Sequence, residues 1–355
     1  MQIARNFLSG KGLVSSSETV AYRPPLYPLF LAGVYFLFGE GYWPIRIVQS
    51  VLGGLSCVMV YYLGEMVLNR RTAKIASGIC GIYPFFIFFT GFELTEILFI
   101  LLLIGGVLLW LRLKDSLTIK ESAFSGIVNG LIVLCRPSAL LFILFASVVF
   151  LFLWWRRNWW KVGILIIFTI LTILPWSVRN FYHFKRFVPL TTMTGLSFWE
   201  GNNPHATGGL CQYWPEEIKN MSEVDRDRYL TKATLRVIVE NPSRFFKLLG
   251  IKFVRFWNIV PNYKGFSSFL YNMVSLLSYP PVIITGIYGM FLTKRKWRRF
   301  LVFYLSFFSF TLIHMIFVGS IRYRVPVMPF MIIFSSYTLS WMWEKVSHSP
   351  RFSLG

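Results

Sequence analysis

Long apolar runs separated by short polar segments dominate the chain. A membrane-spanning helix needs about 20 predominantly apolar residues, and nine runs approach this length. They are Ile45–Leu68, Ala73–Thr90, Leu94–Trp110, Ala123–Cys135, Ala139–Trp155, Val162–Val178, Phe269–Leu292, Phe300–Val318 and Val327–Trp343. We therefore expect an all-α polytopic membrane protein with about nine transmembrane helices.

Composition and charge support a membrane protein and argue against a nucleic-acid partner. The 355 residues are 55% hydrophobic and 14% charged, which leaves too much apolar surface for a soluble chain of this length. The net charge of +21 comes from Lys and Arg in short clusters between the apolar runs, as the positive-inside rule describes. The four cysteines show no paired spacing, so neither a disulfide framework nor a zinc site follows.

Four basic clusters predict the topology. They are Arg70-Arg71 with Lys74, Arg112 with Lys114 and Lys120, Arg156-Arg157 with Lys161, and Lys294-Arg295-Lys296 with Arg298-Arg299. The nine runs place an even number of crossings between successive clusters, so all four can be cytoplasmic. The segments 92–96, 136–137, 179–268 and 320–325 then face the extracytoplasmic side.

Three shorter segments are predicted to form helices that do not cross the membrane. Leu26–Phe38 follows two prolines and is short, which predicts a helix lying in the outer membrane interface. Ser222 and Asp225 resemble a capping box at the start of a soluble helix over 223–240, which Asn241-Pro242 ends. Phe245–Trp257 mixes aromatic residues with Lys and Arg, so we expect a second interfacial helix.

These elements divide the chain into four predicted parts. Residues 1–44 form the remainder of a first extracytoplasmic loop with its interfacial helix, and residues 45–178 form an N-terminal transmembrane bundle. Residues 179–268 form an extracytoplasmic loop with soluble and interfacial helices. Residues 269–355 contain the C-terminal transmembrane helices and a cytoplasmic tail.

Charged residues at the predicted outer surface are the candidates for chemistry, because charge is costly near a membrane and often marks function. Glu93 and Glu96 are three residues apart, a spacing that puts both carboxylates on one helix face. They fit a catalytic base, an acceptor-binding pair or a metal ligand. The alternative is a hydrated helix N-terminus that the helix dipole favours.

Arginines next to prolines form a second group of candidates. Arg23 precedes Pro24-Pro25, and Arg322 and Arg324 precede Val325-Pro326, which predicts extended backbone at both places. Alternate residues of an extended segment point the same way, so Arg322 and Arg324 could converge on one anion. Arg136, at the tip of a tight external hairpin, is a further candidate, and the alternative for all of them is anchoring to lipid headgroups.

One polar loop completes the set of candidates. Asn202 and Asn203 lie in a Gly-Asn-Asn-Pro stretch followed by Gly208-Gly209, which predicts a flexible turn and a candidate acceptor loop.

An ordered series of short motifs resembles a known family. The series is Arg23-Pro-Pro-Leu-Tyr-Pro, Leu94-Thr-Glu96, Arg136-Pro, Pro175-Trp-x-x-Arg179-Asn, Gly201-Asn-Asn-Pro, Glu240-Asn-Pro and Arg322-Tyr-Arg-Val-Pro. It resembles the multi-spanning GT-C glycosyltransferases, and within them the dolichyl-phosphate-mannose protein mannosyltransferase-like branch that includes the lipid A aminoarabinose transferases.

The resemblance implies a function and a set of roles. Members transfer a sugar from a polyprenyl-phosphate donor to an acceptor, a protein or a glycolipid, on the outer face of the cell membrane, here a bacterial inner membrane. By resemblance, Arg23 holds the carrier phosphate, Glu96 lies beside the reaction centre, and Arg322 and Arg324 bind the carrier headgroup. No cofactor is implied, and dependence on a divalent metal stays open.

The beginning of the chain departs from the family. In family members, a segment similar to Ile3–Gly12 follows a first transmembrane helix and an Asp that serves as the catalytic base. This sequence contains neither that helix nor that Asp. We expect either a late start or a truncation with little transferase activity. The alternatives to a glycosyltransferase are a transporter or flippase for a lipid-linked glycan and a non-catalytic remnant.

Overall fold

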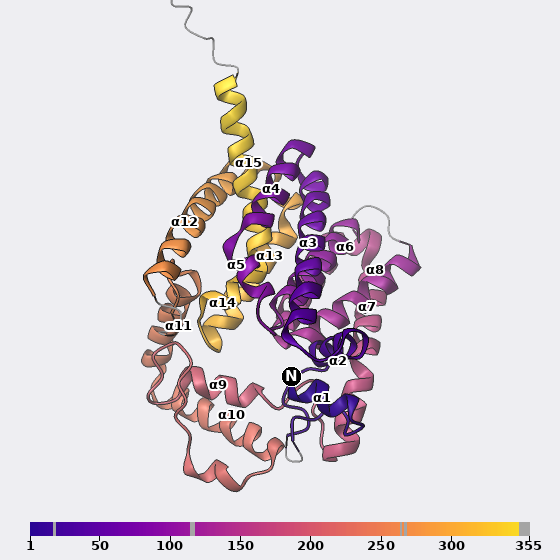
Figure 1. Ribbon diagram of the computed structural model, residues 1–355, viewed down its shortest axis with the longest axis vertical. Helices are drawn as coiled ribbons and strands as arrows, with labels where there is room; N and C mark the ends of the chain where they lie inside the picture. The colour runs from indigo at the N-terminus through magenta and orange to yellow at the C-terminus, as the bar shows by residue number, and fades with distance from the viewer. Residues whose placement is uncertain (17–18, 114–117, 263–264, 266–267, 348–355) are drawn as a thin grey trace, which may run out of the picture.

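The computed structural model describes residues 1–16, 19–113, 118–262, 265 and 268–347, apart from the side chains of residues 154–158. Lys114, the side chains of Arg156 and Arg157, and the end of the predicted cytoplasmic tail therefore lie outside the described part of the chain. The described elements are helices, and Figure 1 shows most of them running along the long axis of the molecule.

The bundle is formed by nine helical elements: α3 (Tyr42–Val67), α4 (Arg70–Ile82), α5 (Pro84–Thr90), α6 (Glu96–Leu113), α7 (Ile119–Cys135), α8 (Leu140–Phe184), α12 (Phe269–Leu292), α13 (Leu301–Ile316) and α15 (Met328–Ser347). In the described residues, five helices are long and apolar enough to cross a membrane, or six if α4 and α5 form one span bent by 50°. The predicted count of nine is not confirmed by this measure. Shorter apolar helices occupy Pro137–Leu153 and Leu301–Ile316, where two further spans are predicted.

The element α8 contains two predicted spans that run in opposite directions. A Cβ at Gly126 of α7 would lie 2.4 Å from the Leu165 carbonyl oxygen, and one at Gly130 would lie 2.4 Å from Thr172. The second part of α8 is therefore parallel to α7. The first part returns antiparallel, because Phe150 packs on Trp110 beside the end of α6 from which the chain enters α7.

Small residues let the bundle helices approach closely. The α7–α8 contact uses the two glycines above, and α12 packs on α15 through Gly286 and Gly289, where a Cβ would meet Met331 and the Phe334 carbonyl oxygen. Such contacts are typical of membrane helices, where dispersion and close backbone approach replace the hydrophobic effect. Stacked phenylalanines of α13 and α15 fill the centre, with Phe303 and Phe330 rings 4.9 Å apart.

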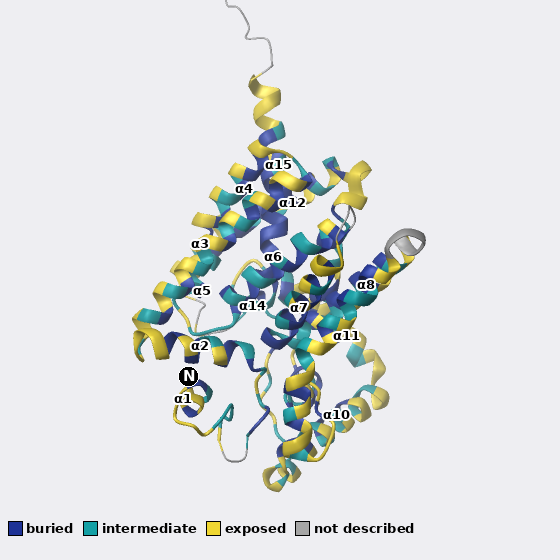
Figure 2. Ribbon diagram, turned by 90° about the vertical axis from the view of Figure 1, so that its right-hand side faces the viewer, coloured by how far each residue is buried: buried dark blue, intermediate teal, exposed yellow. Residues whose placement is uncertain are grey.

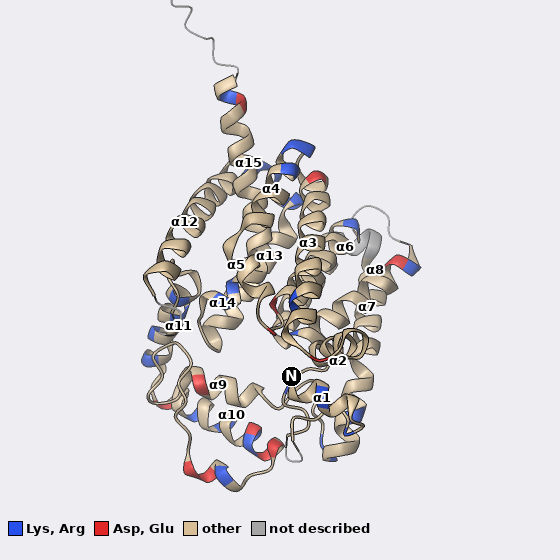
Figure 3. Ribbon diagram, viewed as in Figure 1, with Lys and Arg blue, Asp and Glu red and all other residues tan. Residues whose placement is uncertain are grey.

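One end of the bundle carries the remaining elements, and we call it the loop end. They are α1 (Gln2–Leu8), α2 (Leu26–Phe38), α9 (Thr194–Asn202), α10 (Glu223–Glu240), α11 (Pro242–Trp257) and α14 (Ile321–Arg324), with short 3₁₀ turns at Pro137–Ala139, Glu216–Asn220 and Val325–Val327. A further 3₁₀ turn, Lys294–Arg299, lies at the opposite end, where Arg299 donates to the Val67 carbonyl oxygen at the end of α3. Figure 2 shows α2 lying crosswise at this end, in keeping with the predicted interfacial helix. Figure 3 shows acidic residues concentrated at the loop end around α9 and α10, whereas the opposite end is mainly basic.

The helix predicted after Ser222 is confirmed. The Ser222 hydroxyl accepts the Asp225 backbone N–H at 3.2 Å, and the helix ends at Glu240 before Asn241 caps α11. The second predicted helix over 245–257 is confirmed as α11, which begins three residues earlier at Pro242 because proline is favoured at the first helical position.

Candidate functional site

Three segments far apart in sequence meet at Glu96, the first residue of α6. Its side chain is fully buried, and Oε1 accepts hydrogen bonds from Arg136 Nη2 at 2.7 Å and from Arg322 Nε. Arg136 comes from the turn between α7 and α8, and Arg322 comes from α14. We call Glu96, Arg136 and Arg322 the arginine cluster.

Aromatic rings pack against this cluster on the side of Arg136. The Arg136 guanidinium lies 5.3 Å from the Phe99 ring and 5.7 Å from the Tyr323 ring, and His314 stacks on Tyr323 at 4.2 Å. The side chain of Arg322 remains 38% exposed, so the cluster opens outward through this residue. Two guanidinium groups share one carboxylate, which leaves one positive charge for an external anion.

The prediction that Arg322 and Arg324 converge on one anion is wrong. The segment is not extended but forms the helical turn α14, with the Ser320 hydroxyl accepting the Arg322 backbone N–H at 3.4 Å. Residues two apart on a helix point about 200° apart, because each residue turns the helix by about 100°. Arg322 therefore reaches Glu96, whereas Arg324 is buried and donates to the Phe256 and Asn258 carbonyl oxygens at the end of α11.

The prediction that Glu93 and Glu96 share a helix face is also wrong, because α6 begins at Glu96 and Glu93 lies in the preceding bend. Glu93 is half-buried, and its Oε1 is enclosed without a hydrogen-bond partner among the described residues. Burial raises the pKa of Glu93, and the charges of Arg5 and Arg46 oppose this shift. The two carboxylates therefore belong to different surroundings.

The predicted flexible acceptor loop is a buried junction. Asn202 donates to the Ile316 carbonyl oxygen at 3.0 Å and accepts from Lys252 Nζ at 2.7 Å, while Asn203 donates to the Cys211 carbonyl oxygen at 3.2 Å. Both side chains are at most 1% exposed. Their amides join α9 to α11 and α13 and are not free to bind an acceptor, so the flexible-loop prediction is wrong.

Lys252 holds this junction without a carboxylate in contact among the described residues. It is fully buried, and its second hydrogen bond goes to the Ile316 carbonyl oxygen at 3.1 Å. Burial, with a smaller contribution from the charge of Arg244, lowers the pKa of Lys252 to about 7. The sequence predicts that Lys252 is one of several cations on an interfacial helix. The residues around it in the sequence give no indication that its side chain is buried.

Arg23 is exposed, as the sequence predicts, and its backbone is fixed against the segment before α9. The Thr191 hydroxyl donates to the Tyr22 carbonyl oxygen at 2.8 Å, and the Thr192 N–H donates to the Ala21 carbonyl oxygen at 3.1 Å. The Arg23 guanidinium lies 5.2 Å from the Tyr22 ring. Its charge acts on Glu200 of α9, a buried residue that the sequence analysis did not identify.

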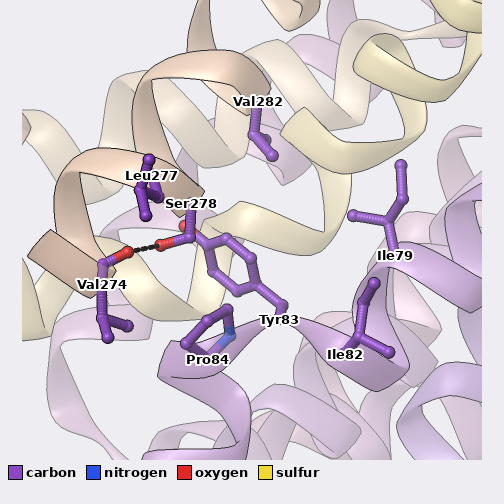
Figure 4. A pocket seen from close by; sticks show the side chains of 8 residues that line it. All are labelled: Ile79, Ile82, Tyr83, Pro84, Val274, Leu277, Ser278 and Val282. Carbon is purple, nitrogen blue, oxygen red and sulfur yellow. Dashed lines mark hydrogen bonds between the residues drawn. The ribbon is translucent and has the colours of Figure 1, made fainter.

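An apolar cavity of about 380 Å³ lies between the α4–α5 bend and α12. Figure 4 shows the Tyr83 ring at this bend, facing α12. The cavity opens on the outer surface of the bundle, where Ile82 and Leu277 are 75% and 69% exposed. Near this bend, the Arg324 guanidinium lies 3.5 Å from the Tyr279 ring and 5.8 Å from the Phe85 ring.

A metal centre has no obvious ligand set in the described part of the chain, since no three His, Cys, Asp or Glu side chains gather there. Asp225 and Asp227, whose spacing resembles a metal motif, are directed apart: Asp225 pairs with Arg186, and Asp227 accepts the Gly195 N–H at 2.6 Å.

Comparisons with known proteins identify the architecture. Residues 22–177, somewhat less than half of the chain, match the model of the dolichyl-phosphate-mannose-protein mannosyltransferase family. The apo oligosaccharyltransferase of Archaeoglobus fulgidus matches 97% of this chain with a TM-score of 0.60 and 13% identity. The same enzyme tethered with an acceptor peptide matches 92%, with a TM-score of 0.57 and 16% identity.

A bacterial protein gives a similar match. ArnT from Cupriavidus metallidurans in the apo state matches 97% of this chain with a TM-score of 0.57 and 14% identity. The chain spans about half the length of these structures, namely 46%, 42% and 55% of them in the order given. No curated protein sequence matches it. These likenesses show that the chain shares the multi-helix fold of these proteins, and residues 22–177 are similar to the dolichyl-phosphate-mannose-protein mannosyltransferase family.

Proposed function

We propose that this protein transfers a sugar from a polyprenyl-phosphate donor to a protein or glycolipid acceptor on the extracytoplasmic side. The observation that carries the proposal is the arginine cluster at the loop end of a GT-C bundle. It holds a buried carboxylate between two guanidinium groups and presents one of them, Arg322, to the outside.

The charge of the loop end suits a phosphate leaving group. Arg322 shares the Glu96 carboxylate with Arg136, so its charge is only partly neutralised. Arg23 is exposed and forms no ion pair in the described chain. Arg322 and Arg23 can therefore each bind an anion. Negative charge develops on the phosphate as the glycosidic bond breaks, and preorganised guanidinium groups stabilise that charge. Arg324 takes no direct part in the proposal, because its guanidinium is bonded to the end of α11.

The distribution of charge supports the proposed side of the membrane. One end of the bundle is mainly basic, and the positive-inside rule favours a cytoplasmic position for such an end. The arginine cluster lies at the other end, which supports an extracytoplasmic site. The apolar cavity between α4–α5 and α12 opens toward the bilayer and offers a surface for part of the polyprenyl chain. These features do not determine which sugar is transferred.

Transfer can be measured in membranes that contain the full chain and a panel of radiolabelled polyprenyl-phosphate monosaccharides. We expect Arg322→Ala and Arg23→Ala each to reduce transfer by about 10²–10³, the effect of removing one preorganised charge-stabilising donor. Arg236→Ala, an exposed arginine on α10, is the control and should leave transfer unchanged. Transfer that survives both Arg322→Ala and Arg23→Ala would falsify the phosphate-binding role. Chelation with EDTA in the same assay tests for a divalent metal.

A further inference from the structure

Glu200 of α9 is a buried carboxylate without a partner. The residue is 7% exposed, yet it forms no hydrogen bond or ion pair with any described residue. Neither oxygen is among the enclosed unpartnered atoms of the protein, so the carboxylate still reaches solvent. Neighbouring polar groups of the same helix are engaged: Trp199 Nε1 donates to the Tyr213 carbonyl oxygen at 2.6 Å, and Asn202 is bonded as described above.

A buried carboxylate without a partner lowers the stability of the folded protein. A carboxylate removed from water without hydrogen bonds either takes up a proton or destabilises the fold. Burial raises the pKa of Glu200 to about 7, and the charge of Arg23 limits the rise. A carboxyl group of this kind exchanges protons readily near neutral pH, as a general base or acid must.

Two charged groups on the elements around Glu200 are engaged in other contacts. Lys252 of α11 donates to Asn202 and the Ile316 carbonyl oxygen, and Asp227 of α10 accepts the Gly195 N–H. The charge of Arg23 acts on the carboxylate, but the two side chains form no ion pair. Glu200 and the charge that acts on it, Arg23, each form no ion pair among the described residues, and we call them the α9 pair.

We propose that Glu200 is the proton acceptor for the acceptor hydroxyl in the sugar transfer, facing the donor phosphate on Arg23. This inference rests on the proposed function. As the acceptor O–H proton passes to Glu200, the acceptor oxygen bonds to the anomeric carbon and the bond from that carbon to the phosphate oxygen breaks. The bonding electrons leave with polyprenyl phosphate, and Glu200 then releases the proton to water.

Kinetics of the full chain in membranes test this role. With radiolabelled polyprenyl-phosphate monosaccharides as donors, we expect Glu200→Gln to lower kcat by about 10²–10⁴, the usual contribution of a general base, with little change in KM for the donor. Glu200→Asp should recover part of the rate. The limb of the kcat profile near pH 7 should disappear in Glu200→Gln, whereas Glu217→Gln, an exposed glutamate of the same outer segment, should behave as wild type.

A second measurement does not depend on turnover. A hydrophobic carbodiimide should label Glu200 faster than Glu217 at pH 7, less as the pH rises, and undecaprenyl phosphate should protect Glu200. Equal labelling of the two residues overturns the proposal.

The outcomes separate the two proposals. An active wild type with an equally active, folded Glu200→Gln overturns the role of Glu200 alone, whereas a wild type that transfers no sugar from the panel overturns the proposed function together with it.

Discussion

Two regions of the loop end bury a glutamate, and they treat it in opposite ways. In the arginine cluster, Glu96 is fully buried and compensated by two guanidinium groups. In the α9 pair, Glu200 is nearly as buried, but its neighbouring arginine does not contact it. Lys252, a buried cation bonded to α9, donates to an amide and a carbonyl oxygen instead of a carboxylate.

The difference shows how burial can serve stability in one place and chemistry in another. A buried carboxylate between arginines is fixed as an ion, and it orients the arginines that surround it. A buried carboxylate without a partner has its protonation set by solvent access and by nearby charge. We therefore expect substitutions in the arginine cluster to destabilise the protein and substitution of Glu200 to spare it.

The largest effect is expected for Glu96→Gln. The substitution leaves two arginines facing a neutral amide in a buried place, and breaking a buried ion pair costs about 3–5 kcal/mol. Thermal unfolding of the full chain in detergent measures the loss. Glu93→Gln is the matched control, since Glu93 forms no ion pair in the described chain. A Glu96→Gln protein as stable as the control would end the contrast between the two regions.

Arg322→Met is expected to have a smaller effect on stability. It removes one partner from Glu96 and leaves the one-to-one pair with Arg136, so the loss is that of a charged hydrogen bond, about 1.5–3 kcal/mol. The same unfolding measurement applies. If Arg322→Met unfolds as readily as Glu96→Gln, the positive charge on Arg322 is not surplus, and the anion-binding argument weakens.

Local signals in the sequence predicted the helices well. The bounds of α2 and α10 follow from prolines, glycines and an N-terminal cap within a few residues of each end, and such signals act without help from distant parts of the chain. The charge clusters also predicted that Glu96, Arg136 and Arg322 lie at the same end of the bundle, and the structure brings the three together.

The partners within the site depend on contacts that the sequence pattern does not encode. Glu96 and Arg322 are 226 residues apart, and Glu200 is buried through contacts that α9 makes with distant segments. The prediction of extended backbone at Arg322–Arg324 was wrong for a related reason. The rule that the residue before proline avoids helical conformation was overridden at Val325, because Ile321–Ser347 runs as one continuous buried span.

Lys252→Met tests whether burial of the Lys252 charge lowers the free energy of unfolding. At pH 7 we expect a loss of about 1 kcal/mol, because Asn202 Oδ1 loses its donor while a buried cation is removed. The pKa of Lys252 is lowered to about 7 in the folded protein from 10.5, so the unfolded chain binds the proton more tightly. Wild-type stability should therefore rise between pH 7 and pH 10, and the variant should lack this rise.

The exposed Lys247 of α11 supplies the control for that measurement. Lys247→Met should keep the wild-type dependence of the unfolding midpoint on pH. An identical pH dependence in Lys252→Met and wild type would show that the buried amine does not titrate in this range.

Glu200→Gln is the one substitution expected to stabilise the protein. Because the pKa of Glu200 is raised from 4.5 to about 7, the folded state binds the proton more tightly than the unfolded chain. Wild-type stability therefore falls as the pH rises from 4.5 to 7. Gln removes this penalty but buries an amide, so we expect a gain on the order of 1 kcal/mol at pH 8 and a smaller or no gain at pH 5.

Unfolding midpoints of wild type and Glu200→Gln at these two pH values decide the matter. A variant that is destabilised at both pH values, as Glu96→Gln should be, would mean that Glu200 has a stabilising partner and that the two glutamates are equivalent. A gain at pH 8 combined with a loss of transfer would separate them fully, because a residue that costs stability and supports turnover is retained for its chemistry.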